Sequence, residues 1–362
     1  MSMGSFSLRH KLVRLSEYHN YKKYISLDAG RKSWARLVFE ILSYSSRDGF
    51  SKKDYMDFKL YRKSSGDLHA YFPSFLWYKF LDEISVPELL EVFDDKLKFH
   101  EQMVAHGLPT PRLLGVFRNG EFGIFNQDSV VNYDISQAEQ AIANLRLLGR
   151  GRVFAKTIRG ARGRGALLID ESMKARELAE LLAGKEYLFQ EYVRQHPDLA
   201  KINPGSLNTL RLLTVRDAEG ASHVAGGFFR VGRGASIVDS AGGGGLANYL
   251  DLQSGKLDEL SHLKYDFGGA SMSSHPDTGA VFGDITLPFY SEAVALVHRA
   301  AAALPNSVVG WDVAITPEGP ILIEGNRHPF IGGDQAIRGP YMQRPKLREL
   351  VLRHRGRADL RP

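Results

Sequence analysis

The residues best suited to chemistry lie in segment 309–326, where two alternating apolar runs flank a Thr-Pro-Glu-Gly-Pro stretch. This pattern is typical of a β-hairpin with a short loop. Pairing Thr316 with Pro320 across a three-residue loop places Asp312 directly opposite Glu324. Their Cβ atoms would then be only about 5 Å apart, and facing carboxylates repel each other. We therefore expect a positive group between them.

An amide joins these carboxylates on the same face of the predicted hairpin. Strand side chains alternate, so Asn326 follows Glu324 on the side of Asp312. The opposite face is apolar and carries Trp311, Val313, Ile315, Ile321 and Ile323. Hard oxygen ligands of this kind suit Mg²⁺, which binds one or two carboxylates together with substrate phosphates. The alternatives are a solvated hairpin face without metal and a one-residue slip that separates the two carboxylates.

A glycine- and arginine-rich segment forms a second candidate site. Residues 152–156 read as a strand that ends in Lys156, and residues 166–169 read as the next strand; the loop between them contains Gly160, Gly163 and Gly165. Such a loop offers backbone N–H groups and mobile positive charge, both suited to phosphate. It is not a Walker loop, because no Gly-Lys-Ser/Thr closes it. A flexible hairpin that contacts RNA is the alternative.

Two arginines interrupt apolar strands. Arg211 lies within predicted strand 207–215, and Arg230 lies within predicted strand 222–231. An unpaired charge in such a strand is costly. Each guanidinium is therefore expected to meet either a bound anion or an internal carboxylate.

Composition places these sites in an ordinary globular chain of 362 residues, 43% hydrophobic and 24% charged. This length suits two or three packed lobes. The absence of cysteine excludes disulfides and thiolate metal sites. No apolar run reaches the roughly 18 residues of a membrane span, and the N-terminus lacks the apolar core of a signal peptide, so we expect a cytoplasmic protein. The formal charge of +6 favours polyanionic partners.

Residues 1–90 are basic and aromatic. Apolar side chains recur there at helical spacing, namely Trp34, Leu37, Val38, Ile41 and Leu42, which predicts short amphipathic helices. We favour packing of this apolar stripe on the rest of the protein. The alternative is docking to a membrane surface or a partner, a role that basic amphipathic helices can serve.

Strands and helices alternate after residue 86, which favours a mixed α/β architecture. A helix is predicted from Glu88 to His106, ending at Gly107. Further helices are expected at 136–148, 173–183, 286–304 and 345–354, and further strands at 112–117, 123–125 and 187–193. Residues 239–245 read as a flexible stretch.

The order of several short motifs resembles the ATP-grasp superfamily, and most closely its sugar-transfer-associated group, related to α-L-glutamate ligases. The resemblance covers about residues 90–330. The motifs are Asp95-Lys96, Gly107-Leu108-Pro109-Thr110-Pro111, Phe154-Ala155-Lys156 with its glycine loop, Gln190-Glu191-Tyr192-Val193, Asn208-Thr209-Leu210-Arg211, and Asp312 with Glu324-Gly325-Asn326.

This resemblance implies an α+β fold in which two lobes grip ATP, preceded by a mainly helical N-terminal region. We accordingly divide the chain into a basic helical region (1–90) for substrate or partner docking, a first ATP-grasp lobe with the glycine-rich loop (91–185), a second lobe with the metal site (186–335) and a basic tail (336–362). The first 90 residues differ from the βαβ domain that usually precedes an ATP-grasp fold.

The resemblance also implies roles for individual residues. Lys96 and Lys156 would hold the ATP phosphates beneath the loop Gly160–Gly165. The adenine pocket would be lined by Gln190, Glu191, Tyr192 and Val193. Two Mg²⁺ ions, or Mn²⁺, would be bound by Asp312, Glu324 and Asn326. Arg211, and with it Arg230, would face the transferred phosphoryl group or the substrate carboxylate.

The implied reaction is Mg-ATP-dependent ligation of a carboxylate to an amine through an acylphosphate, the acceptor being a sugar-linked or small-molecule amine. One alternative is a kinase that passes the γ-phosphoryl group to a hydroxyl. A non-enzymatic RNA- or membrane-binding protein is the other, although no nucleic-acid partner is expected. None of the histidines His196, His223, His298 and His328 is predicted to be an essential base.

Overall fold

The computed structural model describes residues 22–23, 25–45, 51–62, 64, 67–126, 129–160, 163–264 and 267–355. Some of the predicted features lie outside these ranges. They are the basic residues before position 22, Ala161 and Arg162 of the glycine-rich loop, and the end of the basic tail from residue 356.

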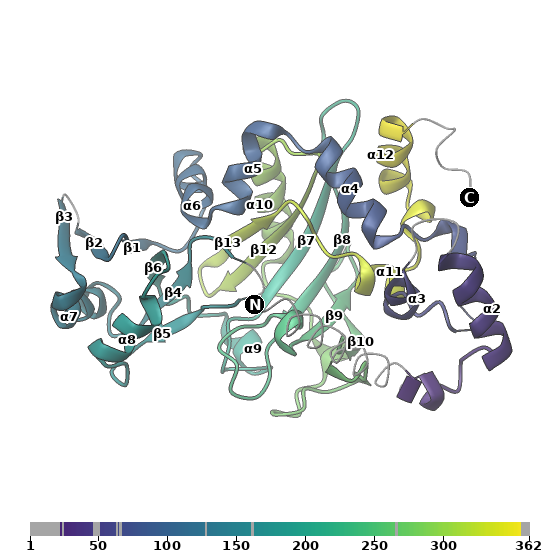
Figure 1. Ribbon diagram of the computed structural model, residues 1–362, viewed down its shortest axis with the longest axis horizontal. Coiled ribbons are helices and arrows are strands. Elements are labelled where there is room, and N and C mark those ends of the chain that lie inside the picture. The colour runs from purple at the N-terminus through teal and green to yellow at the C-terminus, as the bar shows by residue number, and fades with distance from the viewer. Residues whose placement is uncertain are drawn as a thin grey trace, which may run out of the picture.

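The first sheet is antiparallel and six-stranded, with strand order β3-β2-β1-β6-β4-β5 (Figure 1). Its core consists of apolar strand residues packed against α7 and α8. The elements are β1 (Leu113–Arg118), β2 (Glu121–Asn126), β3 (Ser129–Asp134), α7 (Ala138–Leu148), β4 (Val153–Thr157), β5 (Leu167–Ile169), α8 (Ala175–Leu182) and β6 (Tyr187–Glu191). The predicted strands and helices of this region are confirmed, whereas β3 was not foreseen.

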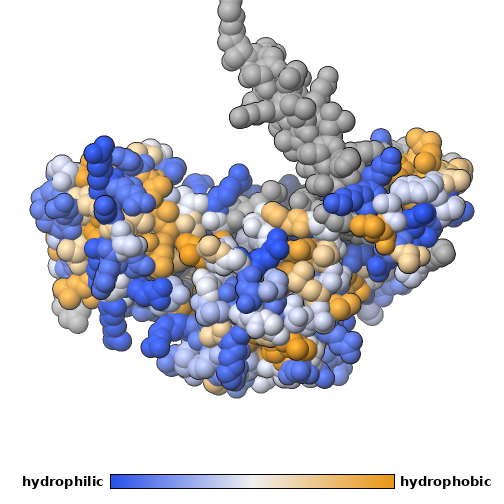
Figure 2. Space-filling view, turned by 90° about the horizontal axis from the view of Figure 1, so that it is seen from below, coloured by the Kyte–Doolittle hydropathy of each residue, from blue (hydrophilic) through white to orange (hydrophobic). Residues whose placement is uncertain are grey.

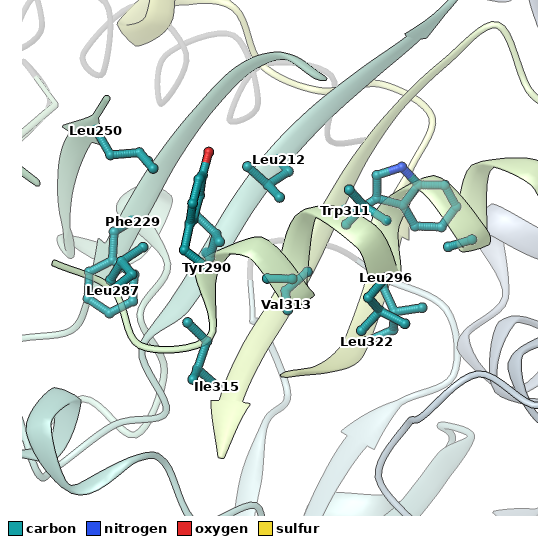
Figure 3. Close-up of a cluster of buried hydrophobic side chains, with 14 of the residues drawn as sticks. Leu212, Phe229, Leu250, Leu287, Tyr290, Leu296, Trp311, Val313, Ile315 and Leu322 are labelled. Atoms are coloured by element: carbon teal, nitrogen blue, oxygen red, sulfur yellow. The ribbon is translucent and has the colours of Figure 1, made fainter. Parts of the chain in front are cut away.

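The second sheet is antiparallel and seven-stranded, in the order β11-β10-β9-β8-β7-β12-β13. Its elements are β7 (Thr209–Arg216), β8 (Ser222–Val231), β9 (Leu246–Leu250), β10 (Leu257–His262), β11 (Ser271–Met272), α10 (Tyr290–Ala303), β12 (Val308–Thr316) and β13 (Gly319–Asn326), with the short helix α9 (Pro197–Ala200) before them. Figure 3 shows the core of this lobe, where Leu212, Trp311 and Val313 meet Tyr290 and Leu296 of α10.

The N-terminal helices and the C-terminal end of the chain pack together on another part of this sheet. Leu213 and Val308 join them in one buried cluster with Trp77, Phe80 and Tyr341. The helices are α2 (Trp34–Ser45), α3 (Lys52–Asp57), α4 (Ser74–Ile84), α11 (Gly332–Arg338) and α12 (Pro345–Arg355). The helices α2, α3 and α4 thus pack beside the large sheet (Figure 1).

The predicted single helix from Glu88 to His106 is wrong. Two helices occupy this stretch, α5 (Pro87–Asp94) and α6 (Lys96–Ala105). Asp95 separates them in an extended conformation, and its carboxylate accepts hydrogen bonds from the backbone N–H groups of Leu97 and Lys98. An aspartate that caps a helix N-terminus in this way begins a new helix, which a hydrophobic pattern alone does not reveal.

The predicted register of the hairpin was wrong at the loop, but the predicted pairing of Asp312 with Glu324 is confirmed. Thr316 pairs with Gly319 across a two-residue loop, and a bulge between Asp312 and Val313 restores the pairing of Asp312 with Glu324. The extra residue also changes the core face of β13. Leu322, and not Ile321 or Ile323, packs with Trp311, Val313 and Ile315.

The packing that we favoured for the apolar stripe of α2 is confirmed in part, because Leu37 and Ile41 pack in the buried cluster with Trp77 and Phe80. Leu37 is buried, whereas Trp34, Val38 and Leu42 are 42%, 56% and 66% exposed. Figure 2 shows hydrophobic surface at the right-hand edge, the side where Figure 1 places α2. A docking role for this face stays a prediction. In the described part of the chain, no helix is long and apolar enough to cross a membrane.

Candidate functional site

A cavity of about 770 Å³ lies where the two sheets and the N-terminal helices meet. Every predicted site residue except Gly165 lines it. Residues on β4 and β6 come from the small sheet, residues on β7, β8, β12 and β13 come from the large sheet, and residues around α3 and α4 come from the N-terminal region. Positions separated by more than 200 residues in sequence therefore share one enclosed space.

The cavity face of the large sheet carries a row of directly paired side chains. The row crosses five strands, from β13 to β9, and consists of Glu324, Asp312, Arg211, Phe228 and Tyr249. Paired residues of antiparallel strands point to the same face. The row changes from charged at the β13 end to aromatic at the β9 end, and the rings of Phe228 and Tyr249 are 5.5 Å apart.

Asp312 is the centre of a buried ion cluster. Arg211 donates to both of its carboxylate oxygens, one bond running from Nη2 to Oδ2 at 2.8 Å, and Arg230 donates to Oδ2 at 2.7 Å. Arg230 also reaches Asp239 at 3.4 Å. Burial by itself would raise the pKa of Asp312, but the two guanidinium groups hold it below its ordinary value. Of the two expected partners of Arg211 and Arg230, a bound anion or an internal carboxylate, the structure thus confirms the internal carboxylate.

The oxygen groups proposed for Mg²⁺ differ in availability. The carboxylate of Glu324 makes no hydrogen bond to any residue within the described ranges, and it faces the cavity. Asn326 donates its amide to Gly310 O at 3.4 Å, which leaves its oxygen as an acceptor. Asp312 differs, because both of its oxygens accept from arginine. In the described residues, no three His, Cys, Asp or Glu side chains form a metal site. Glu324 and Asn326 fit a hard cation, whereas a metal role for Asp312 stays a prediction.

Two lysines contribute positive charge opposite these groups. Lys156, at the end of β4, donates to the backbone oxygen of Ile323 at 3.4 Å. Burial lowers the pKa of Lys156 to about 8; Glu324 opposes this effect and Lys96 adds to it. Lys96 donates to Gly160 O at 2.7 Å and so ties α6 to the glycine-rich loop. Gly160, with φ of +136°, has a backbone conformation that residues with a Cβ rarely adopt.

The segment predicted to bind adenine lies at the end of β6. Gln190 is buried and donates to Pro111 O at 3.4 Å, while Glu191, Tyr192 and Val193 line the cavity. The guanidinium of Arg152 lies 4.4 Å from the centre of the Tyr192 ring. A flat, partly apolar wall of this kind suits a planar heterocycle.

Sequence reasoning missed the cavity residues of the N-terminal region, of β9 and of β10, and it missed Phe228 on β8. Phe228 could have been found, because it lies two residues before Arg230 and so on the same strand face. Asp239 read as part of a flexible stretch, yet its Oδ2 accepts from Thr209 N at 2.8 Å and from the Thr209 hydroxyl at 2.5 Å. No local sequence pattern marked Lys59 or His262 as a cavity residue. His328 lines the cavity and its Nε2 lies 2.7 Å from Asp82 Oδ1; its lack of a base role stays a prediction.

Comparisons with known proteins extend this description. The family described as sugar-transfer-associated ATP-grasp matches residues 78–344. Solved structures with similar folds include D-alanyl-alanine synthetase A from Vibrio cholerae (12% identity, 74% of this chain, 65% of that chain, TM-score 0.43). They also include biotin carboxylase from Campylobacter jejuni (13% identity, 74% of this chain, 47% of that chain, TM-score 0.44). A third is N5-carboxyaminoimidazole ribonucleotide synthetase from Thermotoga maritima (13% identity, 79% of this chain, 57% of that chain, TM-score 0.42). The chain spans between 47% and 65% of the length of these structures. No curated protein matches the sequence.

Proposed function

This chain belongs to the sugar-transfer-associated ATP-grasp family, and we propose that it is a Mg-ATP-dependent ligase that joins a carboxylic acid to an amine. The observation that carries the proposal is the concentration of cationic side chains around one cavity. Lys96, Lys156, Arg211 and Arg230 all line it. The acceptor is a sugar-linked or other small amine.

The reaction brings two anions together, and this explains the need for so much positive charge. A carboxylate oxygen of the acid attacks the γ-phosphorus of ATP, the bond to the bridging oxygen breaks, and ADP leaves. The amine then attacks the acyl carbon, loses a proton and expels phosphate. Fixed cationic groups stabilise charge that develops in such a transition state, so positioning and electrostatics provide most of the catalysis.

Individual residues have distinct parts in this proposal. Lys96 and Lys156 bind the phosphates, and the loop from Gly160 to Gly165 covers them. Glu324 and Asn326 hold Mg²⁺, which neutralises phosphate charge when bound. The number of ions stays a prediction. Arg211 and Arg230, held by Asp312, present their remaining N–H groups to the acid or to the transferred phosphoryl group.

The experiment combines the protein with ATP, Mg²⁺, hydroxylamine and a pool of amino acids and small carboxylic acids. ADP, phosphate and hydroxamate are measured together, and Glu324→Gln serves as the control. Hydroxamate formed by the wild type and not by Glu324→Gln identifies an activated acid and supports the ligase. The pool is then widened to sugars and alcohols. If ADP forms there without hydroxamate and without free phosphate, the protein is a kinase and not a ligase, because a kinase leaves the phosphate on its acceptor.

A further inference from the structure

The cavity continues past the predicted ATP site toward the N-terminal helices. Its far part, which we call the distal half, is lined by Lys59 from the N-terminal region and by Phe228, Tyr249 and His262 from the large sheet. Phe228 and Tyr249 are three and four strands away from Glu324 in the cross-strand row, which is roughly 14–19 Å at the usual strand spacing. The distal half is therefore separate from the place where the γ-phosphate reacts.

Lys59 has an unusual backbone in this half. It follows α3, its N–H donates to Met56 O at 3.0 Å, and the N–H of Leu60 donates to Tyr55 O at 3.0 Å. These two bonds form a Schellman motif, in which the residue at the position of Lys59 adopts a left-handed conformation and is usually glycine. Lys59 has φ of +55°. A lysine at a position that favours glycine retains backbone strain, and such strain often accompanies function.

Among the described residues, no acid pairs directly with Lys59. Its ammonium group makes no hydrogen bond or ion pair with any residue in the described ranges. The nearby Arg62 and Asp28 bind each other at 2.7 Å, so Asp28 compensates Arg62. Burial, together with Arg62, lowers the pKa of Lys59 to about 8, while Asp28 opposes this shift. At neutral pH the amine is therefore still mostly protonated.

The described neighbours of Lys59 do not supply an unpaired negative charge either. Burial lowers the pKa of His262 to about 3, with Lys59 and Arg62 contributing, so this ring is neutral. The described carboxylates that line the cavity near α3 and α11 are already engaged; Asp54, for example, accepts from Ser51 N, the Ser51 hydroxyl and Ser74 N. Asp57 binds Lys53 at 2.7 Å, and Asp334 binds Arg344 at 2.7 Å. A partly buried cation that has no counter-ion among the described residues, and that shares a cavity with aromatic rings, is suited to an anionic ligand.

We propose that Lys59 binds a carboxylate of the non-nucleotide substrate, and that this carboxylate is a second one, which does not react. The inference rests on the proposed function, because the reacting carboxylate must lie at the γ-phosphate, which the distal half does not reach. The body of the substrate lies over Phe228 and Tyr249 and connects the two ends. The substrate class is thus a dicarboxylic acid. A phosphate monoester is less suited to the site, because it carries a charge of about −1.5 to −2 at pH 7, whereas Lys59 supplies a single positive charge.

The test uses Lys59→Gly, because glycine is the residue that the Schellman position favours. This variant removes the amine and relieves the backbone strain, so its melting temperature is expected to equal or exceed that of the wild type. Sebacate, dodecanedioate and tetradecanedioate serve as probes, because a shorter diacid does not reach from the distal half to the region of Glu324. Decanoate, dodecanoate and tetradecanoate are the monocarboxylate controls. Binding is measured by calorimetry in the presence of Mg²⁺ and a non-hydrolysable ATP analogue.

We expect at least one dicarboxylate to bind the wild type, and to bind Lys59→Gly at least about tenfold more weakly, as for loss of a charged hydrogen bond. Lys59→Arg should still bind the dicarboxylate. Its affinity should stay constant above pH 8, where the affinity of the wild type falls. Equal binding of every dicarboxylate to the wild type and Lys59→Gly, whether tight or undetectable, overturns the proposal, as does preference for the monocarboxylates. The ATP analogue should bind all three proteins equally; its failure to bind the wild type would refute the proposed function instead.

Discussion

The ion cluster at Asp312 supports a prediction that separates folding from catalysis. Asp312 and Glu324 are directly paired in the hairpin, and both line the same cavity. Only Asp312 accepts hydrogen bonds from arginine. Replacing each carboxylate by its amide makes the same chemical change at two neighbouring positions. Asp312→Asn should therefore unfold more readily, whereas Glu324→Gln should keep the stability of the wild type and lose activity.

The magnitude follows from the burial of the cluster. The side chains of Asp312, Arg211 and Arg230 are 5%, 12% and 15% exposed. Removing one partner from a buried ion pair costs about 3–5 kcal/mol, because the remaining charges lose their compensation. For a chain of this size the loss corresponds to a melting temperature lower by roughly 4–7 °C. Glu324→Gln breaks no hydrogen bond to a described residue but removes a charge that favours the ammonium group of Lys156, and its effect should stay within about 1 kcal/mol.

The assay is urea unfolding followed by tryptophan fluorescence, since Trp311 is fully buried next to Asp312. It should be repeated at several pH values. Because the folded-state pKa of Asp312 is lowered, its contribution is complete above the unfolded value of 3.8 and is lost as the pH falls through the folded value. Wild type and Asp312→Asn should therefore differ at pH 7 and converge in acid. Equal unfolding midpoints at pH 7 would refute the reasoning.

Three further predictions concern nucleotide binding and packing. The pKa of Lys156 is lowered to about 8, so this side chain loses its positive charge as the pH rises above that value. Titration calorimetry should therefore show that the affinity of the wild type for ATP falls above pH 8. The affinity of Lys156→Arg should not fall there, because arginine stays charged. Arg152→Ala removes the cation–π contact with Tyr192 and should weaken ATP binding by about 2–5-fold, equivalent to about 0.5–1 kcal/mol, in an equilibrium binding assay; unchanged affinity would argue against adenine at Tyr192. Gly325→Ala would place a Cβ 2.9 Å from two phenylalanine rings, so thermal unfolding should report about 1–3 kcal/mol of destabilisation.

The sequence predicted much of the local structure. Helices and strands with clear periodicity, such as α7, α10 and β8, were found close to their observed bounds. Features set by a single side chain or by long-range pairing were not. Asp95 divides a predicted helix because of its cap, and the short strands β9, β10 and β11 lack a strong apolar alternation. These elements depend on partners that are distant in sequence.

For the candidate site, the sequence by itself determined which side chains could share a strand face, because that follows from a period of two residues. It therefore predicted Asp312 beside Glu324, and the predicted pairing is present although the loop and bulge differ from expectation. Only the tertiary structure decided that Arg211 and Arg230 both bind Asp312, and that Lys59 reaches the same cavity from the N-terminal region. The physical reason is that burial and charge compensation depend on contacts between strands and helices far apart in the chain.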